Sequence, residues 1–221
     1  MSILETKNLN KYYKQGKEQS HILKNISLNI NEGDFLGIVG PSGSGKTTLL
    51  YCLSSLEKID GGEVTIEGEN IEDFDNQKLA DLRKHTFGFV FQFYNLIPNL
   101  TAYENILLAN VIANNNTNEK KIDELLELVG MTKYKDYFPN ELSGGMQQRI
   151  AIARSLVNEP KILFADEPTG NLDQKKGNEI MKLLTKLNKE KKLTIILVTH
   201  NEDYLKFCNR TINLIDGEFV G

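Results

Sequence analysis

The chain has 221 residues and a mass of 25.0 kDa, a length that allows one domain with a full core and an inserted subdomain. Its 40% hydrophobic and 25% charged residues are ordinary for a globular protein. A formal net charge of -4 and a pI of about 5.5 give no general electrostatic reason to bind nucleic acid. No stretch approaches the roughly 20 consecutive apolar residues that cross a bilayer, and the first residues lack the apolar core of a secretion signal, so we expect a chain that is soluble on its own. Two cysteines without paired spacing, Cys52 and Cys208, suit a reducing cytosol.

The first thirty residues predict short strands around a polar loop. Residues 26–30 alternate between apolar and polar side chains, as in a strand with one buried face. Residues 11–20 are polar and read as a loop that contains the adjacent Tyr12 and Tyr13. In a strand pair, alternation would place one of these tyrosines toward the core and the other outward.

A glycine-rich segment, residues 40–48, fits the phosphate-binding pattern G-x-x-x-x-G-K-[ST] between an apolar strand and a helix. Its backbone N–H groups can close around phosphate oxygens, and the helix start adds a favourable field for an anion. Lys46 is expected to reach the β- and γ-phosphates, and the Thr47 hydroxyl to bind Mg²⁺. A glycine-rich turn that binds nothing is the alternative, and the strand, helix and Lys-Thr pair together argue against it. The expected phosphate loop comprises Gly40, Ser42, Gly43, Ser44, Gly45, Lys46, Thr47 and Thr48.

Strand and helix patterns follow this loop in turn. A turn and an alternating strand are expected at 60–68, a helix at 77–83, and a buried strand at 87–91 that ends at Gln92. A glutamine at a strand end is usually only a hydrogen-bonding cap. Ligands nevertheless bind at strand ends in open α/β sheets, so Gln92 is a candidate.

Residues 94–160 have a different sequence pattern. Helical spacing at 102–108 and 121–129 is separated by the polar asparagine run 114–118, which reads as a solvated loop. We interpret this region as a helical insertion between sheet strands.

The α/β pattern returns after the insertion. Strands are expected at 161–166 and 193–200, a helix at 177–188, and a last strand and turn at 211–218. Near-continuous apolar runs of this kind are typical of a parallel sheet covered on both faces.

Asp166 and Glu167 close the first of these strands. At this position an aspartate can hold Mg²⁺ through water, and the next carboxylate can face the γ-phosphate and polarise an attacking water. A strand-terminal acidic pair without a nucleotide role is the alternative, and the phosphate loop makes it the weaker one.

The segment 142–154 is the second decisive stretch. Ser143 is a good helix N-cap, and the two glycines after it leave the first-turn N–H groups sterically open. An uncovered helix N-terminus of this kind is an anion site. The chain therefore carries two half-sites for one polyphosphate.

With these motifs the chain resembles, over essentially all 221 residues, the nucleotide-binding subunits of ATP-binding cassette (ABC) transporters. In that family two nucleotide-binding domains meet head to tail, so that the signature motif of one clamps ATP held by the phosphate loop of the other. The resemblance implies ATP and Mg²⁺ as cofactors. It assigns catalytic roles to Lys46, Gln92, Glu167 (general base) and His200 (switch histidine), metal binding to Thr47, Gln92 and Asp166, and nucleotide contacts in trans to the signature residues Ser143, Gly144 and Gly145, with Asp173 in the D-loop.

Two positions need separate comment. The resemblance makes Tyr13 the residue that stacks on adenine, with Tyr12 as the alternative, while a surface or core role suits either tyrosine on sequence grounds. Met146 stands where the family most often has Gln. The contacts of Ser143 and the glycine N–H groups are unaffected, but any polar contact from that side chain across the dimer is lost.

The implied fold is α/β: a P-loop NTPase (RecA-like) core with a parallel sheet, an N-terminal antiparallel β subdomain and an inserted α-helical subdomain. Residues 1–221 then form a single ABC ATPase domain. Its ATP-binding core comprises 1–92 and 160–221, and the helical subdomain that carries the signature motif comprises 93–159.

Segments 89–98, 100–105 and 165–173 most resemble the macrolide-exporter and lipoprotein-release subgroup, whose relatives include ATPases of antimicrobial-peptide resistance systems. That subgroup couples ATP-driven dimer closure to motion of a membrane protein that need not carry substrate through the bilayer. The expected partners are a second copy of the chain and an integral membrane permease, with no nucleic acid. The expected location is peripheral, on the cytoplasmic face of the cell membrane.

The permease contact is expected near residues 93–104. Apolar side chains cluster there, at Phe93, Tyr94, Leu96 and Ile97, and a lone domain would be expected to bury them. Packing inside the helical insertion is the alternative role for this cluster.

Two other classes of protein also contain a phosphate loop. A soluble ABC-type ATPase that acts on nucleic acid or the ribosome predicts a basic face, coiled-coil insertions or two cassettes, and the sequence shows none of them. A P-loop kinase for a small metabolite would not need the helix start at 142–145.

Overall fold

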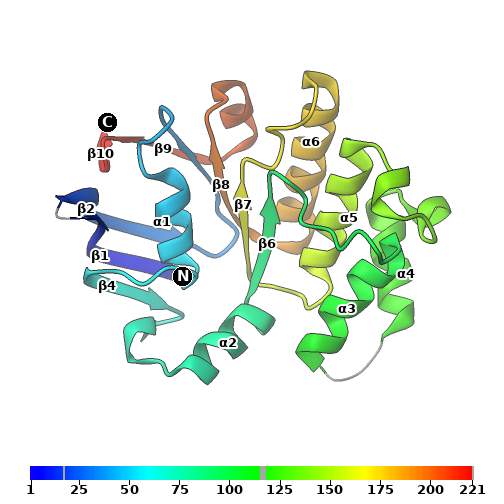
Figure 1. The fold of residues 1–221 in the computed structure, drawn as a ribbon, viewed down its shortest axis with the longest axis horizontal. Coiled ribbons are helices and arrows are strands. Elements are labelled where there is room, and N and C mark those ends of the chain that lie inside the picture. Colours follow the sequence, from blue (N-terminus) through cyan, green and yellow to red (C-terminus); the bar gives the residue numbers. More distant parts are fainter. Residues whose placement is uncertain (17, 115–117, 221) are drawn as a thin grey trace.

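The strands form two sheets, and helices cover both faces of the larger one (Figure 1). The structure is a computed structural model that describes residues 1–16, 18–114 and 118–220. Its mixed α/β architecture, with an antiparallel sheet formed by N-terminal strands and a helical insertion, confirms the predicted fold class.

The larger sheet has the strand order β10-β9-β3-β8-β7-β6 across the described ranges. Neighbours pair in parallel except β10, which is antiparallel to β9. Every residue of β3, β7 and β8 is buried, which explains their continuous apolar sequences. The predicted last strand and turn at 211–218 are confirmed as β9 and a turn at Asp216 and Gly217, which both have positive φ, and the chain then continues into a further strand, β10. The strands are β3 (Phe35–Val39), β6 (Phe87–Phe91), β7 (Ile162–Asp166), β8 (Thr194–Thr199), β9 (Arg210–Ile215) and β10 (Glu218–Val220).

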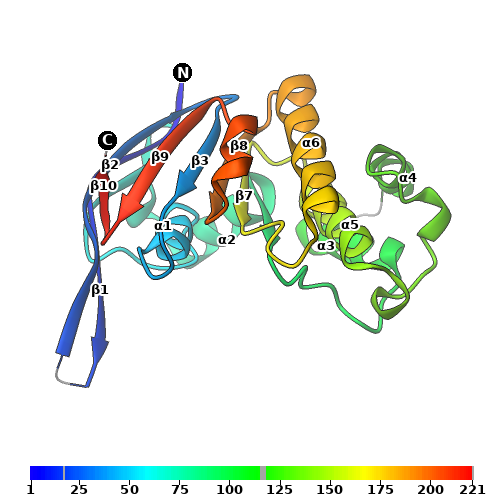
Figure 2. The same ribbon diagram turned by 90° about the horizontal axis from the view of Figure 1, so that it is seen from above.

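The smaller sheet is antiparallel, in the order β2-β1-β4-β5, with β4 at Gly61–Ile66 and β5 at Glu69–Asn70. The predictions of short strands and of a loop at 11–20 were wrong, since β1 (Ser2–Gln15) and β2 (Glu18–Asn31) each have 14 residues. The register shifts between Thr6 and Tyr12 break the two-residue alternation, and the outer part of the hairpin is exposed and polar on both faces. Figure 2 shows this hairpin projecting from the body.

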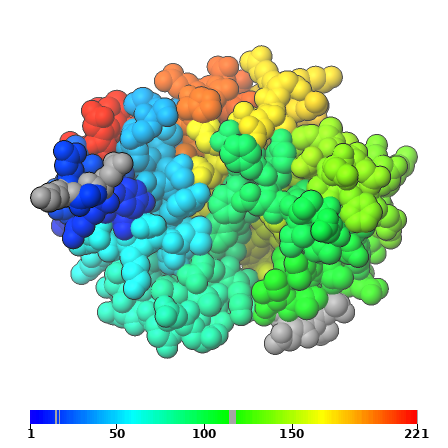
Figure 3. Space-filling model, viewed as in Figure 1, coloured from blue at the N-terminus to red at the C-terminus, as the bar shows by residue number. Residues whose placement is uncertain are grey.

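The helices lie where helical spacing predicts them. They are α1 (Lys46–Leu53), α2 (Asn76–His85), α3 (Ala102–Asn114), α4 (Glu119–Leu128), α5 (Gly144–Leu156) and α6 (Gln174–Lys191), with short 3-10 turns η1 (Ile71–Asp73), η2 (Thr132–Tyr134), η3 (Pro139–Glu141) and η4 (Glu202–Phe207). Residues 115–117 of the predicted asparagine loop lie outside the described residues. In Figure 3 the helical region, green to yellow-green, lies opposite the blue N-terminal strands.

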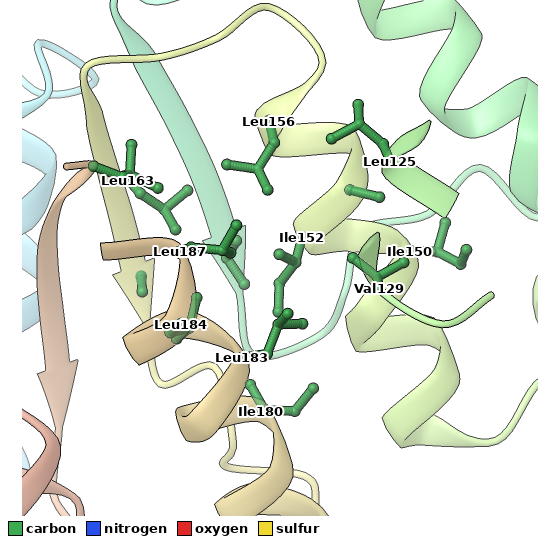
Figure 4. Close-up of a cluster of buried hydrophobic side chains, with 14 of the residues drawn as sticks. Leu125, Val129, Ile150, Ile152, Leu156, Leu163, Ile180, Leu183, Leu184 and Leu187 are labelled. Atoms are coloured by element: carbon green, nitrogen blue, oxygen red, sulfur yellow. The ribbon is translucent and has the colours of Figure 1, made fainter. Parts of the chain in front are cut away.

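Two apolar clusters fill the space on either side of the larger sheet. Successive residues of β8 point to opposite faces, so Ile195 and Leu197 join one cluster while Ile196 and Val198 join the other. The first cluster packs α3, α4, α5 and α6 against the sheet, as Figure 4 shows in part. The second packs α1 between the two sheets. Both faces of the strands are thus covered, and the carboxyl ends of β3, β7 and β8 are left to form the site.

Candidate nucleotide site

The loop between β3 and α1 has a backbone that only small residues allow. Gly45, the N-cap of α1, has φ 99, a conformation that L side chains rarely adopt. A Cβ atom added to Gly40 would lie 2.0 Å from the backbone oxygen of Leu214. The Oγ atom of Ser44 is buried and has no hydrogen-bond partner among the described residues, which fits a loop that receives phosphate oxygens.

Lys46 is held against this loop. Its side chain is mostly buried, and its Nζ donates to the carbonyl oxygens of Gly40, at 2.9 Å, and Pro41, at 2.8 Å. Burial lowers the pKa of the Lys46 ammonium, and the charges of Glu167 and Asp166 oppose the shift. An ammonium has three N–H donors, so one is left for a phosphate oxygen.

Thr47 and Asp166 meet at the carboxyl end of β7. The Thr47 hydroxyl donates to Oδ1 of Asp166 at 3.0 Å, which joins the first helix turn to the strand end. Burial raises the pKa of the Asp166 carboxyl, and the hydrogen bond from Thr47 opposes this. A hydroxyl and a carboxylate are hard oxygen donors of the kind that Mg²⁺ takes, so the pair fits the predicted metal site.

Glu167 and His200 lie at the ends of the adjacent strands β7 and β8. The Nδ1 atom of His200 is 2.8 Å from Oε1 of Glu167. Glu167 has φ 47, an uncommon backbone conformation for a residue with a side chain, and its N–H donates to the oxygen of Val198 at 3.0 Å. The carboxylate is therefore fixed by its own backbone and by a ring on the next strand.

A pocket of about 340 Å³ brings these groups together. Tyr13 and Ile22 of the N-terminal hairpin line it with the phosphate loop, Glu167 and His200. Tyr13 is 42% exposed, whereas the Tyr12 ring stacks on His21 with centroids 4.1 Å apart. The geometry therefore favours Tyr13 over Tyr12 as the aromatic available to a base. Ile22 was not predicted to lie in the pocket, because an isoleucine has no functional group that indicates a binding site.

Gln92 does not line this pocket and makes no hydrogen bond to Thr47 or Asp166 among the described residues. Its Nε2 donates to Oδ1 of Asn171 at 3.2 Å, and Nδ2 of Asn171 donates to the Gln92 carbonyl at 2.9 Å. A Cβ atom on Gly170 would lie 2.8 Å from the Gln92 Nε2, so the side chain packs directly on this glycine. Asn171 therefore holds Gln92 in place. The sequence indicated Asn171 only as part of the segment 165–173, and it did not predict this contact.

The signature residues also lie outside this pocket. Ser143 holds the N-cap position of α5, as predicted, but its side chain makes no capping hydrogen bond and is exposed. Asp173 caps α6 by accepting the Lys176 N–H at 2.9 Å, and the hydrogen bonds from Lys176 lower the pKa of Asp173. Met146 is half-buried and packs against the core of the helical region. The chain thus forms two separate surfaces with phosphate-binding features.

A family model described as ABC transporter matches residues 23–170 of this chain. The ABC transporter ATP-binding protein MJ0796 of Methanocaldococcus jannaschii is 46% identical over 98% of this chain and 94% of its own length. A solved dimeric structure of MJ0796, in a post-hydrolysis state bound to ADP and Pi, matches with a TM-score of 0.91 at 44% identity, covering 99% of this chain and 97% of that chain.

Two further relatives differ in length. The lipoprotein-releasing system ATP-binding protein LolD of Geobacter metallireducens is 42% identical over 99% of this chain and 98% of its own length. The macrolide export ATP-binding/permease protein MacB of Mannheimia succiniciproducens is 43% identical over 100% of this chain but only 34% of its own length, so the chain spans about a third of MacB. Since the family model covers most of the chain and relatives above 40% identity cover nearly all of it, the chain belongs to the ABC transporter family as one of its ATP-binding subunits.

Proposed function

We propose that the pocket lined by Tyr13, the phosphate loop and Glu167 binds ATP with Mg²⁺, and that Glu167 is the base for its hydrolysis. The observation that carries this assignment is the Glu167–His200 pair, which shares one pocket with the phosphate loop. Tyr13 stacks on the base, the loop N–H groups and Lys46 bind the phosphates, and Thr47 and Asp166 hold the metal.

Each group has a distinct part in the reaction. Mg²⁺ bound at Thr47 and Asp166 neutralises charge on the phosphate oxygens. Lys46 stabilises the charge that develops on the transferred phosphoryl group, with its remaining N–H. The Glu167 carboxylate accepts a proton from the attacking water, and His200 keeps that carboxylate oriented and faces the γ-phosphate.

We infer that two copies assemble head to tail around two ATP molecules. Ser143, Gly144 and Gly145 begin α5 outside the chain's own nucleotide pocket, and the Ser143 hydroxyl is free of any capping bond. A helix start with open N–H groups suits the γ-phosphate of ATP bound by the second copy, and Asp173 lies in the adjacent turn. The relative MJ0796 is dimeric in its solved structure.

We further propose that residues 93–159 act as a helical unit against a core formed by 1–92 and 160–221, and that this unit contacts a membrane permease. Within the apolar cluster, Phe93 is 72% exposed and Ile97 is 41% exposed, so these two side chains are available to a partner. Leu96 instead packs against the core of the helical region. Tyr134, Tyr137 and Phe138 add exposed aromatic surface, and the Tyr137 carbonyl accepts the N–H of Ala102 at the start of α3. Exposed apolar patches of this kind mark interaction sites.

A peripheral location on the cytoplasmic face of the cell membrane follows from this role. No helix in the described part of the chain is long and apolar enough to span a bilayer. The names of LolD and MacB, from lipoprotein release and macrolide export, support an exporter-like or mechanotransmitting system acting on a lipoprotein, macrolide or antimicrobial peptide. Gln92 is proposed to sense the γ-phosphate and Mg²⁺ and to pass that signal to the helical unit.

The test of the catalytic assignment is Glu167→Gln, with Glu202→Gln as a matched control next to the site. The Glu167 variant should bind ATP like the parent, hydrolyse it about 10²- to 10⁴-fold more slowly because the base is gone, and accumulate as a dimer in size-exclusion chromatography. The control should behave like the parent. Normal turnover in Glu167→Gln would show that Glu167 is not the base for hydrolysis.

The partner is tested by purifying the tagged chain from its own membranes in mild detergent. A stoichiometric protein with several membrane spans supports the transporter role. Recovery with ribosomes or nucleic acid instead would contradict it.

A further inference from the structure

The turn at Tyr94 and Asn95, which follows Gln92 and Phe93, has an uncommon backbone conformation. Tyr94 has φ 60 and Asn95 has φ 51, so two consecutive residues with side chains occupy the left-handed region. Such conformations persist only where surrounding contacts impose them. The contacts that impose this one come from α5.

Arg154 of α5 binds the turn through its backbone. Its two terminal nitrogens donate to the carbonyl oxygens of Asn95 and of Tyr94, the latter at 2.8 Å. Arg154 forms no salt bridge with a carboxylate among the described residues, and burial lowers the pKa of its guanidinium. Both terminal nitrogens are therefore given to these two carbonyls as a planar fork, whereas a lysine would present a single nitrogen on a shorter side chain.

The side chain of Tyr94 reaches the other end of the same helix. A Cβ atom on Gly144 would lie 2.6 Å from the Tyr94 hydroxyl oxygen, so the end of the Tyr94 side chain packs directly on this glycine. Gly144 is one of the signature residues at the start of α5. Tyr94 is thus fixed to α5 twice, by its carbonyl at Arg154 and by its ring at Gly144.

A third contact ties the strand before the turn to α5. Gln148, which is fully buried, donates from Nε2 to the carbonyl of Phe91 at 3.5 Å. The segment 91–95 is therefore bound to α5 through Phe91, Tyr94 and Asn95, and Gln92 lies within that segment. A displacement of Gln92 must either move α5 or break these contacts, because a packed helix moves as a rigid element.

We propose that Arg154 is a positioning residue that couples Gln92 to the signature residues. By holding the Tyr94–Asn95 turn, it keeps the Tyr94 ring against Gly144 and so orients the start of α5 toward the nucleotide of a second copy. This rests on the proposed head-to-tail assembly. Nucleotide binding by the chain's own pocket does not involve Arg154, which lies outside that pocket.

The experiment uses the full chain in the Glu167→Gln background and separates two affinities. Binding of MgATP to dilute protein is measured with a fluorescent ATP analogue, and MgATP-dependent dimerisation by analytical ultracentrifugation. Arg154→Lys keeps the charge but loses the fork. It should weaken dimerisation at least about tenfold, the scale of one charge-assisted hydrogen bond, and leave nucleotide binding within about twofold.

Arg149→Lys is the control on the same helix. Arg149 also donates to a carbonyl, that of Val129 at 3.1 Å, and it pairs with Glu179, so its replacement removes comparable contacts without touching the turn. Both of its affinities should stay within about twofold of the parent.

A second pair of variants tests the same turn from its exposed side. Asn95→Val places a β-branched residue at a positive φ, which should open the turn and reproduce the dimerisation loss of Arg154→Lys. Asn95→Gly accepts that φ and should dimerise like the parent. Because the Asn95 side chain is exposed, this pair remains informative if Arg154→Lys does not fold.

The outcomes separate the two proposals. If the parent does not dimerise with MgATP, the head-to-tail assembly fails and the role of Arg154 fails with it. If the parent dimerises and both Arg154→Lys and Asn95→Val dimerise equally well, only the role of Arg154 fails. Equal losses of nucleotide binding and dimerisation, together with a lower Tm, would show a merely structural arginine and would also overturn the proposal.

Discussion

The imidazole of His200 holds the carboxylate of Glu167, with Nδ1 2.8 Å from Oε1. The two residues are 33 positions apart in the chain and meet because β7 and β8 are adjacent parallel strands that end at the same edge of the sheet. His200 is largely exposed while Glu167 is mostly buried, so the ring covers the carboxylate from the solvent side. The arrangement fixes the orientation of the carboxylate, as the proposed role of Glu167 as the base requires.

His200→Ala should therefore lower ATP hydrolysis about 10²-fold, the scale of losing one preorganised catalytic hydrogen bond, with ATP affinity within about twofold. His85→Ala at the end of α2, which does not line the pocket, is the control. Steady-state phosphate release measures the rate of hydrolysis, and equilibrium ATP binding measures the affinity. A parallel loss of both would mean that His200 shapes the pocket and does not act on the reaction.

Tyr13→Ala should weaken ATP binding by about 1–3 kcal/mol, the range for removing one aromatic–base stack, and Tyr13→Phe should restore it. Tyr12→Ala should have a smaller effect because the Tyr12 ring already stacks on His21. Titration calorimetry with ATP on the three variants measures this. A larger loss in Tyr12→Ala than in Tyr13→Ala would reverse the assignment.

Asn171→Ala removes both hydrogen bonds that hold Gln92. We expect it to resemble Gln92→Ala: stimulation of hydrolysis by the permease falls several-fold, while MgATP binding stays within about twofold, because neither residue lines the nucleotide pocket. Asn178→Ala, at a half-buried position of α6, is the control. Should the Asn171 and Gln92 variants lose binding and stimulation equally, the coupling role would be excluded.

Ser143→Arg should retain ATP binding and lose hydrolysis, because the arginine blocks the start of α5 without entering the chain's own pocket. Lys46→Ala should also lose hydrolysis, because it removes a phosphate contact from the other half of the site. A mixture of the two inactive variants is the sharper test, since a head-to-tail heterodimer contains one site with both halves intact. Recovery of hydrolysis on mixing supports action in trans, and an inactive mixture counts against it.

Asp166→Asn should change stability with a definite pH dependence in the absence of Mg²⁺. Burial raises the pKa of Asp166 above its ordinary 3.8, so ionising it costs more in the folded state, and this penalty is complete above the folded pKa and absent below the unfolded one. The variant should therefore be more stable than the parent in urea unfolding at neutral pH, with a difference that shrinks as pH falls.

Asp173→Asn is the control with the opposite sign. Hydrogen bonds from Lys176 lower the pKa of Asp173, so its ionised form contributes stability that is present at neutral pH and lost as pH falls through the folded pKa. This variant should be less stable than the parent at neutral pH. If the two variants shift the free energy of unfolding in the same direction, the burial argument for Asp166 is wrong.

Local patterns accounted for the elements that build the site. The phosphate loop was predictable because its glycines meet a local need, a backbone with positive φ at Gly45 and a close approach to Leu214 at Gly40. The buried parallel strands were predictable because strands covered on both faces have continuous apolar sequences. Asp166 and Glu167 were placed correctly at a strand end for the same reason.

The N-terminal hairpin was misread because its outer half is stabilised by cross-strand pairing, not by an alternating apolar face. Tyr12 pairs with His21 and Tyr13 with Ser20, and the polar residues around the two tyrosines form no alternating pattern. The pairing also decided which tyrosine faces the pocket.

The sequence by itself thus indicated the proposed chemistry: a phosphate loop, a strand-terminal acidic pair and an open helix start, each encoded in a few neighbouring residues, with the role of His200 implied by the family resemblance. Only the tertiary structure decided what those groups touch. Gln92 meets Asn171 79 positions away, and Arg154 holds the carbonyls of Tyr94 and Asn95 across about 60. Hydrogen bonds to backbone carbonyls can be made to any residue type, so they leave no pattern in the sequence and depend on how the helices and strands pack.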